Sequence, residues 1–379
     1  GGGRRRRGTG GARRRVAGEP GRWCAFVPRG GRGPNAMRRS ARLVAGSFHH
    51  SDFAWQDWAA EARRELDALD RRGDAGAAAD AAGEARGGGG GGVGEASGVA
   101  QGGPDGVAPR KFGPAPMPAA EAIAAASAAA SAARGMEACW DSIHGQNSTA
   151  GRYPNKAYIP LAFPELARGD VRVVVEMGCA TGGSLRPVLA ANPALAEYWA
   201  TDLSSAALEA LRASGTLPEG RRVELLRWDA TEPPPAELPA GRADAVLITF
   251  VLSAVAPGHH AACLRHAARL LRPGGLVLVR DHGLYDHTML RFHRRGRRIA
   301  DALYARGDGT TAFYLSPEGL LGAVEEAAAG LRAVDGPCYH CNLTTNRKTG
   351  HSIHRVFLHA KLRLEADGAG AAATGAGDT

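Results

Sequence analysis

The sequence predicts an α/β fold centred on a mainly parallel seven-stranded sheet with helices on both faces. Apolar runs of strand length alternate with helical patterns between residues 172 and 339, an order that is typical of parallel sheets. The last two apolar runs, near 333–339 and 354–362, have no helix between them, so we expect the final strand to pair antiparallel.

Each element follows from a local pattern. The first strand rests on three consecutive valines at 173–175, a β-branched run of the kind buried on both faces of a parallel sheet. The other runs are bounded in the same way by turn residues or by helical patterns. We expect strands near 172–176, 197–201, 222–228, 243–250, 275–281, 333–339 and 354–362, and helices near 184–191, 204–213, 257–271 and 316–329.

The rest of the chain divides by composition and charge. Residues 1–45 contain 13 arginines and one glutamate, whereas the whole chain of 379 residues has a formal net charge of +9. The remainder is therefore close to neutral. We expect a disordered basic arm or targeting segment at 1–47, a short aromatic docking element at 48–67, a Gly/Ala-rich linker at 68–118, the α/β domain at 119–364 and a disordered tail at 365–379.

The segments around the strand ends predict a site for an adenosine-bearing ligand. Gly178 and Gly182 bracket the turn after the first strand, and glycines let backbone N–H groups approach a ligand at a helix N-terminus. Asp202 follows the second strand, where a carboxylate suits a ribose diol. Asp229, after the third strand, suits an adenine amino group, and Thr249 closes the fourth strand. Neither a GKS/GKT phosphate loop nor a GxGxxG turn is present here.

Other classes of site are not expected. The single CxxC, at 338–341, has no second CxxC or HxxxH beside it, so we predict no metal. No apolar run reaches the roughly 18 residues of a membrane span, so we expect no membrane association. We expect a cytoplasmic protein, and a mitochondrion or chloroplast stays open because the segment after Met37 carries Arg and Ser without an acid.

Several motifs carry a resemblance to a known family. EMGCATG at 176–182 resembles the first motif of S-adenosylmethionine-dependent methyltransferases. FVLSAV (250–255), LRPGG (271–275), YARGDGTTAFY (304–314) and NRKTGHSIHRVFL (346–358) resemble the tRNA 3-methylcytidine methyltransferases of the methyltransferase-like group. VRDHGLYDHTMLRF, at 279–292, is the most particular of them. The resemblance covers about residues 137–362.

The resemblance implies a Rossmann-like class I methyltransferase fold, S-adenosylmethionine as cofactor, tRNA as substrate and a possible protein partner that helps select the tRNA. The cofactor residues that it implies are Trp140, His144, Glu176, Gly178, Gly182, Asp202, Asp229, Ala230 and Thr249. The chain departs from the family pattern at several positions. Ala180 and Gly183 stand where the family usually has Gly and Asn, and His144 and His282 replace Tyr. The last departure is RYPNK at 152–156, which replaces a more basic aromatic segment. This last departure bears on substrate contacts more than on cofactor binding.

The implied chemistry is methyl transfer to N3 of a cytidine in the anticodon loop. That nitrogen keeps an in-plane lone pair, so alignment rather than a general base is required, and the base must be unpaired. Asp281, after the fifth strand, is expected either to stabilise the developing positive charge or to cap the following loop. The expected RNA-binding residues are Arg291, Arg294, Arg295, Arg298 and Arg306.

Two other functions stay open at this point. One is a methyltransferase of protein or small-molecule substrates, because fold does not fix the substrate. The other is a non-catalytic RNA-binding paralogue, which the altered RYPNK segment would favour.

Overall fold

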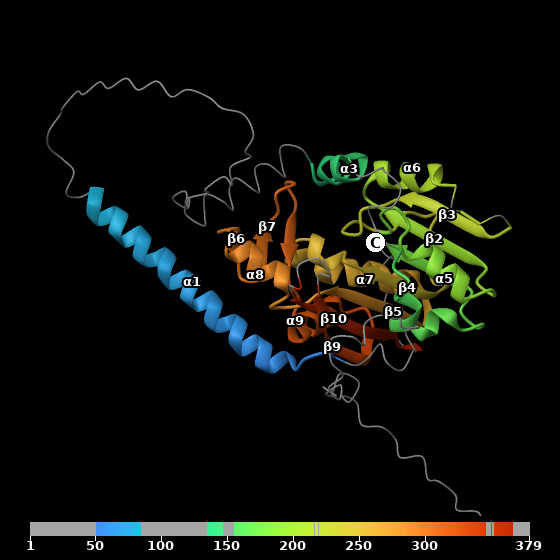
Figure 1. Cartoon of the computed structure of the whole chain (residues 1–379). Helices are drawn as coiled ribbons and strands as arrows, with labels where there is room; N and C mark the ends of the chain where they lie inside the picture. The colour runs from blue at the N-terminus through green and yellow to red at the C-terminus, as the bar shows by residue number, and fades with distance from the viewer. Residues whose placement is uncertain are drawn as a thin grey trace, which may run out of the picture.

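In a computed structural model of the chain, seven strands form one sheet in the order β3-β2-β1-β4-β5-β10-β9 (Figure 1). The structure describes residues 51–84, 135–146, 155–215, 217–218, 220–345, 350 and 352–366. The strands are β1 (Val173–Met177), β2 (Glu197–Asp202), β3 (Arg222–Arg227), β4 (Ala243–Thr249), β5 (Leu271–His282), β9 (Leu331–Thr345) and β10 (Ser352–Leu364).

The pairing confirms the predicted fold class. β1 pairs parallel with β2 and β4, β2 with β3, and β4 with β5. β10 is antiparallel to both of its neighbours, β5 and β9, so the final strand of the sequence lies inside the sheet rather than at its edge. The chain leaves β1 toward β2 on one side and later returns to β4 on the other. In open α/β sheets such a reversal marks the place where ligands bind, which here is the carboxyl ends of β1 and β4.

Helices cover both faces because successive strand residues point to opposite sides. Val173 and Val175 of β1 belong to one buried cluster, which includes residues of α7 (His260–Leu270) and α9 (Pro317–Ala327). Val174 belongs to a second cluster, with α4 (Ile159–Ala162), α5 (Leu185–Ala191) and α6 (Ser205–Ala213). Short 3₁₀ helices η3 (Pro164–Ala167), η4 (Leu252–Ala254) and η5 (Pro257–His259) complete the connections.

A small second sheet follows β5 and was not predicted. Its strands β6 (Arg298–Ala300), β7 (Leu303–Ala305) and β8 (Thr311–Phe313) are antiparallel, and α8 (His287–His293) precedes them. Each strand has only three residues, too few to show an alternating pattern.

The N-terminal helix α1 (Trp55–Glu84) lies against α8 (Figure 1). The indole N–H of Trp58 donates to the Tyr285 carbonyl at 2.8 Å, and the Trp55 ring stacks on Tyr339 at 4.6 Å. α1 continues to Glu84, so residues 68–84, which we placed in the linker, are helical. Alanine-rich sequence with strong helix propensity explains the difference. The predicted arm (1–47), the remainder of the linker and nearly all of the predicted tail lie outside the described residues.

Candidate active site

Two positions in the turn after β1 accommodate only glycine. Gly178 has a φ of +71° and Gly182 a φ of +81°, conformations that strain any residue with a Cβ. A Cβ on Gly178 would lie 2.3 Å from Cγ2 of Val251, and one on Gly182 would lie 2.6 Å from Cδ1 of Leu211. The turn therefore presents backbone rather than side chains at the carboxyl end of β1.

Asp202 ends β2 beside this turn and fixes it. Its Oδ2 accepts the Ala180 N–H at 2.8 Å, and its Oδ1 accepts the Ser204 N–H at 2.9 Å. Burial raises the pKa of Asp202, and these two N–H groups act in the opposite direction. Each carboxylate oxygen has a second lone pair, so both remain able to accept a ribose hydroxyl.

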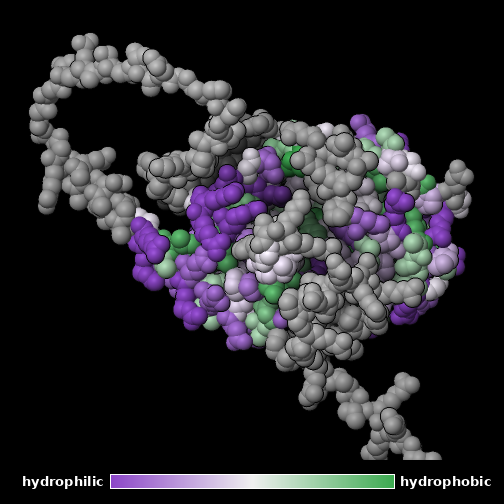
Figure 2. Space-filling model, in the orientation of Figure 1, coloured by the Kyte–Doolittle hydropathy of each residue, from purple (hydrophilic) through white to green (hydrophobic). Residues whose placement is uncertain are grey.

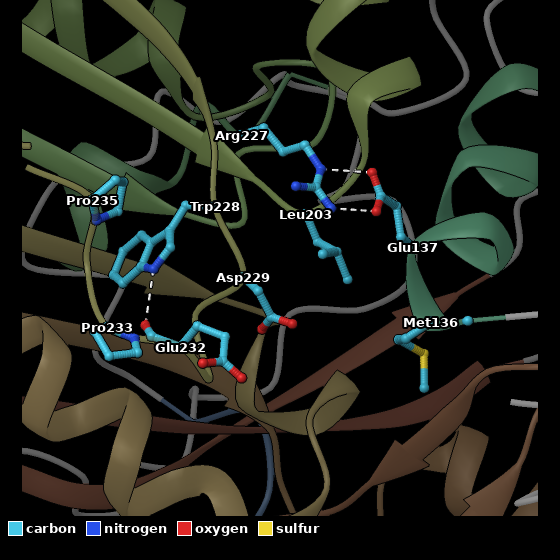
Figure 3. Close-up of a pocket in the computed structure, with 10 residues that line it drawn as sticks. Met136, Glu137, Leu203, Arg227, Trp228, Asp229, Glu232, Pro233 and Pro235 are labelled. Atoms are coloured by element: carbon cyan, nitrogen blue, oxygen red, sulfur yellow. Dashed lines mark hydrogen bonds and ion pairs between the residues drawn. The ribbon is translucent and has the colours of Figure 1, made fainter. Parts of the chain in front are cut away.

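Asp229 lines a cavity of about 480 Å³, to which Leu203, the residue after Asp202, also contributes (Figure 3). Its Oδ1 accepts the N–H of Thr231 at 2.9 Å and the hydroxyl of the same residue at 2.7 Å, which leaves Oδ2 for another donor. The cavity is lined by residues that follow β2 and β3 and by the start of α3: Gly135, Met136, Glu137, Leu203, Arg227, Trp228, Asp229, Glu232, Pro233 and Pro235. The lining combines apolar side chains with the carboxylates of Glu137, Asp229 and Glu232, and Glu137 is paired with Arg227. A pocket of this size can admit an adenine ring.

Helix α3 (Met136–Gln146) packs against α6 (Figure 1), and its Glu137 pairs with Arg227 at the end of β3. Asp141 anchors it, because its Oδ1 accepts the Ser204 hydroxyl at 2.6 Å and the Ala206 N–H at 3.0 Å. His144 is buried, and burial lowers its pKa whereas the nearby Asp202 carboxylate acts in the opposite direction. The Trp140 ring lies 5.8 Å from the guanidinium carbon of Arg306. Both predicted α3 residues thus lie on the segment that packs over the candidate cofactor site.

Three further residues that were predicted to bind the cofactor belong to the strands and loops that surround the site. Glu176 is fully buried, and its Oε2 accepts the Tyr198 hydroxyl at 2.6 Å, which joins β1 to β2. Thr249 is buried at the end of β4. The Ala230 carbonyl lies 3.1 Å from Nδ1 of His266 on α7.

Lys156 is a site residue that the sequence prediction did not single out. Its backbone N–H donates to the Gly183 carbonyl at 2.8 Å, and its ammonium donates to the Thr249 hydroxyl at 3.0 Å. Burial raises the pKa of Glu176, and the Lys156 ammonium is the largest influence that opposes it. A cation therefore lies between the ends of β1 and β4. Only four lysines occur among 47 basic residues, and that rarity was the available signal.

Asp281, predicted as catalytic or structural, is fully buried at the end of β5. Its Oδ2 accepts the Ser253 N–H at 3.1 Å, and its Oδ1 accepts the His282 N–H at 2.7 Å. These contacts favour the structural alternative, because Oδ2 holds the backbone of η4 and Oδ1 that of the last residue of β5. Asp286 acts similarly: its Oδ2 accepts Nε of Arg355 at 2.8 Å and the Val356 N–H at 2.9 Å, which joins α8 to β10.

A hydrophilic area lies over α8 and β6 (Figure 2). These elements carry Arg291 and Arg298, with Arg294 and Arg295 between them, and two of these arginines pair with acidic residues of α1. Nε of Arg294 lies 2.5 Å from Oε1 of Glu65, and an Nη of Arg298 lies 3.2 Å from Oδ2 of Asp70. Arg306 pairs with Asp308 at 3.7 Å. Arg291 and Arg295 extend the same stretch from α8 into the following turn.

Comparison with known proteins identifies the family of the chain. A family model described as a methyltransferase domain matches residues 175–277. The Drosophila melanogaster tRNA N(3)-methylcytidine methyltransferase Mettl2 is 33% identical over 234 residues, which cover 59% of this chain and 70% of that protein. The Mus musculus tRNA N(3)-cytidine methyltransferase METTL6 is 33% identical over 230 residues, 59% of this chain and 79% of that protein. The chain belongs to the tRNA N(3)-cytidine methyltransferase family.

Membership of this methyltransferase family confirms the resemblance predicted from EMGCATG and VRDHGLYDHTMLRF. The Schizosaccharomyces pombe tRNA N(3)-methylcytidine methyltransferase trm140 is 29% identical over 235 residues, which cover 60% of this chain and 74% of that protein. The cofactor is S-adenosylmethionine, and the residues described here fit it: a glycine turn closed to side chains, a cavity bearing Asp229, and the Lys156 cation. Among the described helices, none is both long and apolar enough to cross a bilayer.

Proposed function

We propose that this protein methylates N3 of an unpaired cytidine in the anticodon loop of a tRNA. The observation that carries the proposal is membership of a family whose named relatives act on tRNA cytidine. The glycine turn, Asp202, Asp229 and Lys156 support it because they gather at one edge of the sheet.

Four groups of this chain would hold the cofactor. Asp202 accepts the ribose hydroxyls, and Asp229 accepts the adenine amino group in the cavity that α3 borders. Lys156 pairs with the carboxylate of the methionine part, since its ammonium is the cation beside the glycine turn. Helix α3 shields the site from water. The cofactor supplies an electrophilic methyl group on a sulfonium.

The remaining work of the protein is alignment. Cytosine N3 carries a lone pair in the ring plane at neutral pH, so the chain needs no residue to remove a proton before transfer. Holding this lone pair in line with the methyl group supplies the rate enhancement. Asp281 contributes as a positioning residue, because it fixes Ser253 of η4 and His282 at the end of β5.

RNA contact is proposed along α8 and β6. Arg291 and Arg295 lie there, and Arg294 and Arg298 become available when their α1 partners are displaced or neutralised. Arginines of this kind hold phosphates and make binding dependent on salt.

Nucleoside mass spectrometry of methylated transcripts tests the proposal. The full chain, S-adenosylmethionine and a set of unmodified tRNA transcripts should give 3-methylcytidine, and changing the target cytidine to uridine should abolish it. The Asp202→Ala variant is the matched control, with cofactor binding weakened by about 1–3 kcal/mol. RNA binding without any 3-methylcytidine would favour a non-catalytic paralogue, and methyl transfer to another molecule would reject the substrate.

A further inference from the structure

Three aromatic side chains gather at the carboxyl ends of β4 and β5. Phe250 follows β4, His282 ends β5, and Phe357 lies opposite His282 in the antiparallel register of β10. The ring centroid of Phe250 lies 4.9 Å from that of His282 and 5.9 Å from that of Phe357. All three side chains are half-buried, so they form a surface cluster beside the core.

The cluster adjoins the candidate cofactor site. The Lys156 ammonium that bonds to Thr249 lies 5.6 Å from the centroid of the Phe250 ring. Direct methyl transfer requires the target nitrogen and the donor methyl to be in contact. The target base must therefore lie at the carboxyl edge of the sheet, and the side chains next to the cofactor site along β4 and β5 are these rings.

The backbone at Phe250 is held in an uncommon conformation. Its φ is +60°, which is rare for a bulky residue and is concentrated at functional sites. Its N–H donates to the Arg280 carbonyl at 2.9 Å, so the pairing with β5 maintains this conformation. In this conformation the ring lies against those of His282 and Phe357.

His282 carries a second sign of a ligand. Among the described residues its Nδ1 is buried and makes no hydrogen bond, whereas buried polar atoms are normally paired. Burial lowers the pKa of His282, so the ring is neutral at pH 7. A neutral imidazole nitrogen donates or accepts according to its tautomer. Cytosine offers both an amino donor and a carbonyl acceptor on its Watson–Crick edge.

Two arginine side chains hold the Phe357 ring in place. The guanidinium carbon of the buried Arg280 lies 4.5 Å from its ring centroid, and that of Arg355 lies 5.0 Å away. Arg355 is held in turn by Asp286 at 2.8 Å. The ring is therefore preorganised, which lowers the entropy that a stacking partner would lose.

We propose that Phe250, His282 and Phe357 form the pocket that takes the extruded target cytosine. Because the rings of Phe250 and Phe357 meet edge to face at 71°, one of them stacks on the base and the other packs against its rim, and His282 contacts its Watson–Crick edge. This inference rests on the proposed function, since it names the groups by which that function recognises its base. Stacking is available to any base, whereas the contact from His282 favours cytosine over uracil, which lacks the amino donor.

Steady-state kinetics on an anticodon stem-loop test the pocket. Phe250→Leu and Phe357→Leu keep apolar volume but remove the aromatic face. We expect kcat/KM for RNA to fall roughly 5- to 150-fold, the equivalent of one lost base stack, with cofactor affinity by calorimetry unchanged. Phe313→Leu is the matched control, because Phe313 packs on His260 of α7, outside the cluster, and should leave both quantities unchanged.

His282→Phe separates the hydrogen bond from the stacking. It keeps a ring of similar size but removes both nitrogens, and we expect kcat/KM to fall about 5- to 150-fold with cofactor affinity retained. Retained cofactor affinity shows that each variant is folded. Wild-type kinetics in all cluster variants would overturn the pocket and leave the proposed function standing. A wild-type chain that makes no 3-methylcytidine would overturn the proposed function and the pocket with it.

Discussion

Gly178→Ala is the sharpest test of the glycine turn, because the structure supplies both a magnitude and a control. The added Cβ would lie 2.3 Å from Cγ2 of Val251 and would sit on a backbone with a φ of +71°. Gly241 has nearly the same φ, +67°, but nothing lies within 4 Å of its added Cβ. It also precedes β4, at the opposite edge of the sheet. Gly241→Ala therefore reports the backbone strain alone.

The expected free energies of unfolding differ between the two variants. The left-handed backbone costs a non-glycine residue about 1–2 kcal/mol, of which about 0.4–1 kcal/mol is recovered through the unfolded state. Gly241→Ala should lose roughly this difference, about 1 kcal/mol or less. Gly178→Ala should lose a further 1–3 kcal/mol from overpacking against Val251.

Urea unfolding and calorimetry with S-adenosylmethionine measure the two quantities. We expect Gly178→Ala to weaken cofactor binding together with stability, and Gly241→Ala to leave binding unchanged. If both variants lost the same stability and Gly178→Ala bound the cofactor with unchanged affinity, the close contact between the Gly178 backbone and Val251 would not be what shapes the site.

Three other changes have expected outcomes. Lys156→Met should raise the cofactor dissociation constant roughly 10- to 150-fold in calorimetry, the value of a hydrogen bond to a charged group; an unchanged constant would remove the ammonium from the site. Glu65→Gln/Asp70→Asn should tighten RNA binding and steepen its dependence on salt by up to about two counterions, measured by filter binding at several salt concentrations; an unaltered slope would mean that the paired arginines do not contact phosphate. A protein beginning at Met37 should transfer methyl groups at the rate of the full chain, whereas one beginning at Lys111 should be slower because it lacks α1; equal rates for all three would exclude a role for α1.

The parallel half of the fold was predictable because its strands are long and strongly apolar. The valines at 173–175 and the buried run of β4 leave no other assignment. β6 to β8 were not predictable, since three-residue strands are defined by their partners rather than by their own sequence.

The residues of the candidate site were likewise only partly predictable from the sequence. The positions of Asp202 and Asp229 follow from the ends of strands, which sequence patterns locate well. The environment of Asp281 does not, because a carboxylate at a strand end serves equally to touch a ligand or to accept backbone N–H groups. Lys156 reaches the site through tertiary packing alone.

The place of β10 within the sheet governs the order in which this protein can fold. β10 fills the gap between β5 and β9, so the sheet stays divided until residues 352–364 have left the ribosome. Until then β5 has an open edge, which invites pairing with other chains. The Trp58 ring of α1 stacks on His354 of β10 at 3.9 Å. The helix nearest the start of the described chain therefore completes its packing only after β10 is in place, although its other contacts are to residues that precede β10.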